Sequence, residues 1–297
     1  STGIQGNLPL EYALTLIQKV NQLWQPVGIQ FFLYGAIDYS IQNDDLYNST
    51  TKEKMYALMK VNSVPGTINV YFANLGDYTG VSTLTDQSPQ GVALNYSFPY
   101  PLSSVITMPE LMAHELGHYF DLYHTHETKF GVECPNKSNC KTAGDLLCDT
   151  TADPKLTIFN TVNCIYDNSA PLPTASCGDT PYDPPITNLM SYARSECTKQ
   201  FTGDQINKVL NTLLNNDKRK NLMNTKARYV DLLASGSNTN CTYTAPCRTV
   251  EKAVQAASNG DFIFIKAGAY WTPSFGGKRL ALGRWGVEPG SGALLVP

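Results

Sequence analysis

The sequence predicts an α+β protein of 297 residues organised in two domains, 1–227 and 228–297. Three observations lead to this prediction. Helix and strand patterns alternate over roughly the first 120 residues, which indicates a sheet layered against helices. The periodicity then fails from Thr125 to Thr187, where turn-forming residues and cysteines accumulate. After Lys226 the pattern changes to short apolar strands separated by turns.

Five segments of the first domain have the periodicity of helices or short strands. Residues 9–25 place apolar side chains at helical spacing, with Pro9 suited to the first turn and Pro26 ending the helix. Apolar runs bounded by turn residues predict the strands. The expected elements are a helix over 9–25, strands over 28–34, 67–73 and 91–96, and a helix over 51–61 capped by Thr50 or Thr51.

Residues 202–216 predict a closing helix for the first domain. Thr202 and Gln205 have the spacing of a capping box, in which two side chains and two backbone N–H groups bond reciprocally. An apolar stripe that we expect in the core follows at helical spacing, formed by Ile206, Val209, Leu210, Leu213 and Leu214.

Composition and charge argue against several kinds of partner. A net charge of −3 gives no basic field, so we expect no nucleic-acid partner. No apolar run has the length of a membrane span. The N-terminus lacks a basic-then-apolar signal segment, so a secreted protein would here be in processed form.

The eight cysteines predict disulfides and therefore an oxidising, extracellular location. None occurs in the first 133 residues, and six fall between 134 and 197. A cysteine zinc site is the alternative, but no pair has C-x-x-C spacing. Cys241 and Cys247 are expected to close a local loop.

All four histidines lie between positions 114 and 126. His114 and His118 are i and i+4 on a predicted helix, so both imidazoles leave one face, and Glu115 follows the first of them. With His124 they supply three ligands for a catalytic zinc, which keeps a fourth position open for water. Glu115 can take the proton of that water. His126 is surplus, and we expect it on the surface or behind the ligands.

His124 can join the other two histidines only if the helix ends between them and the chain reverses. In the pattern H-E-x-x-H-x-x-G-x-x-H a glycine in the left-handed conformation ends the helix. Here Asp121 holds that place. Aspartate is among the non-glycine residues that tolerate this conformation best, so the sequence still predicts the reversal.

The ordered set of motifs resembles the pappalysin, or cytophagalysin-like, family of metzincin zinc metallopeptidases over about residues 10–225. The segments that carry the resemblance are the histidine motif, Gly144-Asp145-Leu146-Leu147-Cys148-Asp149-Thr150, Asn188-Leu189-Met190-Ser191-Tyr192, Cys197 and Phe201-Thr202. The resemblance implies a zincin fold: a twisted mixed sheet with a backing helix and an active-site helix, and an irregular, disulfide-linked lower lobe. It also implies that Met190 lies in a turn under the metal.

The function that the resemblance implies is a secreted zinc endopeptidase acting on proteins or peptides, with Glu115 as general base. Tyr192 would turn toward the metal and donate a hydrogen bond to the reacting carbonyl oxygen; a packed aromatic is the alternative. The strand over 91–96 is a candidate sheet edge along which an extended substrate can pair, or else an ordinary core strand.

Two further functions use the same residues. The first is a catalytically silent adhesion or carbohydrate-binding protein whose zinc fold serves as a scaffold, against which the intact Glu115 argues. The second is a zinc hydrolase of a small amide, which would differ in the length of its cleft.

The resemblance further implies that the cysteines on either side of the methionine turn do not pair with each other. We therefore expect Cys148 with Cys177 and Cys164 with Cys197, leaving Cys134 with Cys140; Cys140 in place of Cys148 is the alternative. In metzincins the segment after the methionine lines a specificity pocket, where Glu196 would favour a basic residue after the scissile bond. Pairing with Arg194, or solvation, would remove this preference.

Two features of the chain have a second explanation. Aspartates in the loop could bind a structural calcium, although turn formation explains them equally well: they are Asp145, Asp149, Asp153, Asp179 and Asp183.

Residues 228–297 resemble the start of a right-handed parallel β-helix of the pectin-lyase-like kind. About three coils are needed for stability and this segment has room for little more than one, so we expect either a longer protein or packing on the first domain.

Overall fold

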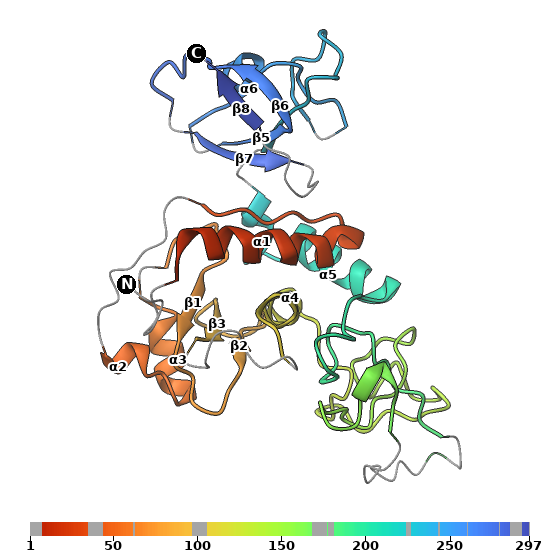
Figure 1. Cartoon of the computed structure of the whole chain (residues 1–297). Helices are drawn as coiled ribbons and strands as arrows, with labels where there is room; N and C mark the ends of the chain where they lie inside the picture. The colour runs from red at the N-terminus through yellow and green to blue at the C-terminus, as the bar shows by residue number, and fades with distance from the viewer. Residues whose placement is uncertain are drawn as a thin grey trace. The chain divides into compact units, whose positions relative to one another are not determined.

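The structure, a computed structural model, describes residues 8–34, 44–61, 63–96, 106–167, 177, 181–223, 227–242, 244–259, 261–278, 280–285 and 293–296. The chain divides into two compact units, one within Ser1–Leu33 and Ile37–Asn221 and the other within Tyr34–Ala36 and Leu222–Pro297 (Figure 1). The second unit thus begins slightly before the boundary expected after residue 227. Among the described residues no helix has both the length and the apolarity to cross a membrane.

Two long helices form the frame of the first unit. Helix α1 (Leu10–Trp24) continues into η1 (Gln25–Val27), which Gly28 ends at a φ of 76°. Helix α1 packs against α4 (Met108–Tyr119), and α4 packs in turn against the sheet (Figure 1). Trp24 is fully buried, with its ring 5.0–5.7 Å from the rings of Phe31, Phe120 and Phe201. This aromatic cluster joins α1 to the end of α4 and to the segment before α5 (Gly203–Asn215).

The strand expected over 28–34 is wrong, because these residues, all of them described, form no strand. The Asn21 side chain on α1 bonds the Phe31 backbone at both its N–H (2.7 Å) and its carbonyl oxygen (2.8 Å). One amide side chain therefore satisfies the backbone groups that a neighbouring strand would have paired.

The sheet of the first unit is mixed and has the order β1-β3-β2. Strand β1 (Val70–Ala73) runs parallel to β3 (Val92–Asn95), and β2 (Gly80–Ser82) runs antiparallel to it. Helices α2 (Asp44–Tyr47) and α3 (Lys52–Leu58) pack on β1. Thr51 caps α3 and accepts a hydrogen bond from the backbone N–H of Lys54.

The expectation that residues 91–96 form a sheet edge is wrong. Strand β3 is central and all four of its residues are buried, as in the core-strand alternative. The edge strands are β1 and β2. The sequence did not reveal β2, because three residues that include a glycine show no period-two pattern. The edge strand next to α4 is therefore Gly80–Ser82.

From Asp121 to Thr202 the described chain consists mostly of turns, with the short helix η2 (Val162–Cys164), and is drawn in yellow to green in Figure 1. Disulfides cross-link it. Cys164 pairs with Cys197 as expected, and the pair Cys241 with Cys247 in the second unit is also as expected.

Two expected disulfides, Cys148 with Cys177 and Cys134 with Cys140, are wrong. Instead Cys140 pairs with Cys148, and Cys134 pairs with Cys177. Gly144 and Leu146 both take left-handed conformations, at φ of 63° and 68°, which turn the chain back so that Cys140 and Cys148 lie 5.0 Å apart between Cα atoms. Cys134 is thereby left for Cys177, whose carbonyl oxygen accepts a hydrogen bond from Asn136.

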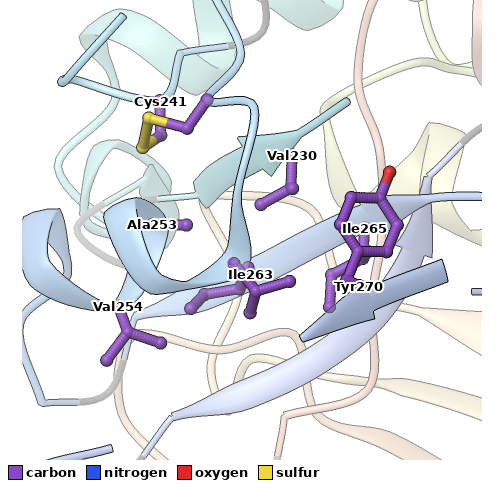
Figure 2. Close-up of a cluster of buried hydrophobic side chains, with 9 residues drawn as sticks. Val230, Cys241, Ala253, Val254, Ile263, Ile265 and Tyr270 are labelled. Carbon is purple, nitrogen blue, oxygen red and sulfur yellow. A yellow bond between two sulfur atoms is a disulfide. The ribbon is translucent and has the colours of Figure 1, made fainter. Parts of the chain in front are cut away.

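The described part of the second unit contains short parallel strands and the helix α6. Strands β4 (Ala227–Val230), β5 (Phe262–Lys266) and β7 (Ala281–Trp285) form one parallel sheet, and β6 (Gly268–Trp271) pairs in parallel with β8 (Ala293–Val296). Helix α6 (Val250–Ala256) contributes to the buried core (Figure 2), which consists of Val230, Cys241, Cys247, Val250, Ala253, Val254, Ile263, Ile265 and Tyr270. Strands also stack in parallel in a β-helix. A β-helix for residues 228–297 remains a prediction.

Candidate active site

Helix α4 presents the first two histidines, of which His114 is buried and His118 is half-buried. Pro109 lies in its first turn, a position that suits proline. His114 and Glu115 are only 8% and 4% exposed. The Nδ1–H of His114 donates to the carbonyl oxygen of Leu189 (2.6 Å), and that of His118 donates to Leu122 (2.7 Å). These bonds fix the tautomer, so each Nε2 carries a lone pair that is free for a metal.

The helix ends in the reversal that the sequence predicts. Asp121 is left-handed at a φ of 67°. Its backbone N–H bonds the carbonyl oxygen of His118 (2.9 Å), and the N–H of Leu122 bonds that of Gly117 (3.0 Å). This pair of bonds is a Schellman motif, which satisfies carbonyl groups at the helix end while the chain turns back. The turn brings His124 to the other two imidazoles.

The three imidazoles converge on one point. The Nε2 atom of His118 lies 3.1 Å from that of His114 and 3.0 Å from that of His124. Zinc held tetrahedrally at about 2.0–2.1 Å would place its ligand nitrogens about 3.3 Å apart. Lone pairs directed at one another repel unless a cation lies between them. Among the described residues this is the one group of three or more potential ligands able to hold a metal ion, and it fits zinc.

Burial sets the protonation of this group. It lowers the pKa of His114 to about 3 and that of His118 to about 4, and it also lowers the pKa of His124. All three rings are therefore neutral at neutral pH, as metal binding requires. Burial raises the pKa of Glu115 to about 8 in the metal-free protein. A bound cation would favour the carboxylate and return Glu115 to its basic form.

Met190 lies directly against α4. Its side chain is fully buried, and a Cβ added at Gly117 would lie 2.4 Å from its sulfur atom. The carbonyl oxygen of Met190 accepts from the N–H of Thr125 (3.2 Å), next to His124, while Leu189 holds His114. The methionine turn thus supports two of the three imidazoles through adjacent backbone carbonyls.

The closing helix α5 anchors this turn. The predicted capping box is present, with Thr202 accepting from Gln205 N–H and Gln205 accepting from the backbone of Thr202. The Gln205 side chain also exchanges two hydrogen bonds with Asn188, at 2.8 and 3.1 Å. Asn188 in turn accepts from the N–H of Met190 (2.8 Å). The helix cap and the methionine turn therefore form one network.

Tyr192 and His126 lie beside the metal ligands. The Tyr192 ring is 4.7 Å from that of His124 and 4.4 Å from that of His126, and the residue is 43% exposed. His126 stacks on His124 with ring centroids 4.7 Å apart. A cavity of about 470 Å³ is lined by both histidines and by Lys155. Tyr192 thus lies where it can reach a molecule bound next to His124.

Glu196 does not join this group. Its carboxylate accepts from Arg194 Nε (3.1 Å), and its side chain is 47% exposed. This is the pairing that the sequence offered as the alternative to a specificity role. The neighbouring Ser195 is buried and accepts from the N–H of Thr107 at the start of α4 (3.0 Å).

Two of the loop aspartates organise turns: Asp145 accepts from the N–H of Leu147 (3.0 Å), and Asp153 accepts from the N–H of Leu156 (2.8 Å). These two bonds match the turn-forming explanation. Asp149 instead joins the loop to the start of α5, where it accepts from the Thr202 hydroxyl (2.8 Å) and from Asp204 N–H (2.7 Å). Asp179 lies outside the described residues.

Glu133 is a buried acid that the sequence analysis did not find. It is 4% exposed, and neither of its carboxylate oxygens has a hydrogen-bond partner; Oδ2 of Asp145 is also buried without a partner. Burial, followed by the charge of Asp145, raises the pKa of Glu133 to about 7. A single glutamate has no sequence pattern of its own, although the neighbouring Gly144 leaves the space that its carboxylate fills.

Residues 67–214 match a peptidase M43 family model described as pregnancy-associated plasma protein-A. An extracellular metalloprotease of Neurospora crassa is 27% identical over 212 residues, and one of Sordaria macrospora is 26% identical over the same length. Each alignment covers 64% of this chain and 62% of the relative. The chain therefore spans less than two thirds of the length of these relatives.

Mature mirolysin of Tannerella forsythia, solved in complex with a cleaved peptide, has a similar fold. Its TM-score is 0.50 at 18% identity, covering 73% of this chain and 89% of mirolysin. The fold of the chain is thus a mixed α+β fold that resembles mirolysin. The chain is thus similar in sequence to extracellular metalloproteases, and its histidine triad could hold a zinc ion.

Proposed function

We propose that the protein is a secreted zinc endopeptidase that hydrolyses peptide bonds. One observation carries the proposal: the Nε2 atoms of His114 and His124 lie 3.1 and 3.0 Å from that of His118. Helix α4, which bears His114 and His118, also bears the buried Glu115. The extracellular metalloproteases to which the chain is similar, and its four disulfides, support a secreted enzyme.

Each residue of the site has a distinct role in this proposal. When bound, zinc supplies a Lewis acid that polarises the scissile carbonyl and acidifies water. Glu115 accepts the proton of the attacking water and passes it to the leaving amine. Tyr192 donates its phenolic hydrogen toward the developing oxyanion; burial raises its pKa, so the donor stays protonated at neutral pH.

The edge strand β2 is the place where an extended substrate would align. In the described part of the chain β2 pairs with β3 alone, so its other edge is open to a peptide. Strand β2 also packs against α4, which carries Glu115. This replaces residues 91–96 as the substrate-aligning strand.

The proposal is tested by comparing the wild type with Glu115→Ala on a denatured protein substrate, with zinc measured by mass spectrometry. We expect one zinc per chain in both proteins and a loss of about 10²–10⁴-fold in activity in the variant. Glu53→Gln, at an exposed acid of α3, is the control and should be fully active. A variant within tenfold of the wild type would contradict the role of Glu115, and zinc without turnover in the wild type would favour the scaffold alternative.

A preference for a basic residue after the scissile bond would rest on Glu196. Its ion pair with Arg194 neutralises the charge that would attract a basic side chain. A peptide-library digest of wild type and Glu196→Gln tests it. Equal enrichment of basic residues in both proteins, or none in the wild type, would remove Glu196 as a specificity residue.

We also propose that the loop binds calcium, with Glu133 and Asp145 as ligands. Their unpartnered buried oxygens are the kind of group that a hard cation coordinates. Calcium should raise the unfolding temperature of the wild type and have no such effect on Glu133→Gln. Asp77→Asn, at an exposed acid, should respond like the wild type. Equal responses in all three proteins would contradict this site.

A further inference from the structure

Asp121 does more than end the active-site helix. Both of its carboxylate oxygens accept hydrogen bonds from one residue, Thr85: Oδ1 from the backbone N–H (2.8 Å) and Oδ2 from the hydroxyl (2.7 Å). Thr85 lies three residues beyond β2. A glycine, which the histidine pattern has at this position, could form the same helix end but could not make these two bonds.

A buried arginine strengthens the same junction. Arg219 is fully buried; its Nε donates to the carbonyl oxygen of Tyr119 (2.6 Å) in the last turn of α4, and its Nη2 donates to that of Thr83 (3.3 Å). Its guanidinium lies 3.5 Å from the centre of the Tyr119 ring. Burial lowers the pKa of Arg219, while the charge of Asp121 opposes that shift. The aspartate thus also helps to keep a buried cation at the helix end.

The strand held by this junction touches the proposed base. A Cβ added at Gly80 would lie 2.5 Å from Oε1 of Glu115 and 2.8 Å from its Cδ and Cγ atoms. The backbone of β2 therefore packs directly on the Glu115 side chain, with no room for even a methyl group. A displacement of β2 by a few tenths of an ångström would move this carboxylate or release it.

We propose that Asp121 is a positioning residue: through Thr85 it fixes β2 on α4, so that Gly80 holds the Glu115 carboxylate in place. This inference rests on the proposed function and extends it to a residue outside the metal ligands. It gives a role to Asp121, which stands where the histidine pattern has glycine. The aspartate ends the helix and, with the same side chain, ties down the strand that borders the site.

The test measures kcat and KM on one peptide substrate, together with zinc content and hydrogen exchange, for Asp121→Gly, Asp121→Asn and the wild type. Asp121→Gly keeps the left-handed turn and should keep its zinc, but kcat should fall about ten- to hundredfold, more than KM changes. Exchange over residues 80–86 should be faster. Asp121→Asn keeps an acceptor for the Thr85 N–H and should stay within about threefold of the wild type in kcat, a rescue that a purely stabilising role would not give.

Two further variants keep the inference falsifiable. Thr85→Val leaves the helix end untouched and removes only the hydroxyl bond, so it should show a smaller loss in the same direction. Lys137→Gly, at another left-handed residue (φ 60°), removes similar backbone strain in the loop and should change neither kcat nor exchange over residues 80–86. An Asp121→Gly variant with a kcat within about threefold of the wild type, or with unchanged exchange there, would overturn the inference.

The failure of the proposed function would look different. A wild type that bound zinc but cleaved no peptide would contradict the proposed endopeptidase function. The exchange measurement would still test the tether, meaning the two hydrogen bonds by which Asp121 holds Thr85. Faster exchange over residues 80–86 in Asp121→Gly supports that tether, and unchanged exchange overturns it.

Discussion

The two halves of the first unit hold their shape by different means. The helices α1 and α4 and the sheet β1–β3 depend on an apolar core and on backbone pairing. The segment from Asp121 to Thr202 depends on disulfides and on side-chain caps from asparagine and aspartate. The metal site draws on both: α4 supplies His114 and His118, and the irregular segment supplies His124. Accurate placement of a ligand therefore does not require regular secondary structure, provided that its backbone groups are bonded.

Few hydrogen bonds join the two halves, and two of them each fix a particular backbone group. His114 on α4 donates to Leu189 of the methionine turn, and the N–H of Thr107 at the start of α4 donates to Ser195. Because each contact fixes a backbone group, a small change in the loop would reach the imidazoles without altering α4. Damage to the core should lower the stability of the whole unit, whereas damage to the loop should act locally. The four predictions below test this difference, from the largest expected effect to the smallest.

The largest effect should come from the core of the regular half. Trp24→Ala removes a fully buried side chain in contact with three other rings, so we expect it to lower the free energy of unfolding by about 3–5 kcal/mol. Chemical denaturation monitored by circular dichroism measures this. Trp24→Phe should cost less, because it keeps a ring and removes an indole N–H that has no partner. A loss below about 1 kcal/mol for Trp24→Ala would show that this cluster does not hold the half together.

The same contrast explains what could be predicted from the sequence. Helices α1 and α5 are long, periodic and bounded by a proline or a cap, and their positions were predicted to within a few residues. For α4 the sequence indicated the face that carries the histidines and the end near Asp121. The three imidazoles converge because helical spacing and one reversal at Asp121 are both visible in the sequence. Strand β2 was missed because it is three residues long.

The irregular half was less predictable for a physical reason. Its disulfide pairing depends on left-handed residues such as Leu146, whose conformation no propensity indicates. The burial of Glu133 likewise depends on contacts between distant segments. Local sequence patterns report hydrogen bonding within an element, and this region has little of it.

The disulfides should dominate the stability of the irregular half. Replacing Cys164 and Cys197 together by serine opens a link between residues 33 apart and should cost about 3.5–4 kcal/mol. The matched control is Cys140 with Cys148, separated by 8 residues, which should cost about 2.5 kcal/mol. Both are measured by non-reducing denaturation and by hydrogen exchange, which should increase in the loop before it increases in α1. Equal losses would contradict a chain-entropy origin.

A pH-dependent effect, smaller per pH unit than the losses above, should come from Glu115. Its pKa in the folded, metal-free protein is raised to about 8 from a usual value of 4.5, so the folded state holds a proton that the unfolded state has lost between these pH values. The free energy of unfolding of the wild type should therefore fall with rising pH relative to Glu115→Gln, by at most about 1.4 kcal/mol per pH unit.

The measurement is denaturation of both metal-free proteins at several pH values from 4 to 9. We expect the difference to grow between about pH 4.5 and 8 and to stay level above that. Zinc should reduce it, because the cation stabilises the carboxylate. A difference that is constant across this range would show that burial does not perturb Glu115.

The smallest effect should arise where the irregular half meets helix α5. The Thr202 side chain accepts from the N–H of Gln205 (3.3 Å) and donates to Asp149 (2.8 Å), and Asp149 accepts in turn from Asp204 N–H (2.7 Å). Thr202→Ala removes the cap and should cost about 1 kcal/mol, within the usual range for such a residue. Thr202→Ser keeps the hydroxyl and should be nearly neutral. If serine were as damaging as alanine, the methyl group and not the hydrogen bonds would matter here, and the loop would join α5 by packing, as the regular half does.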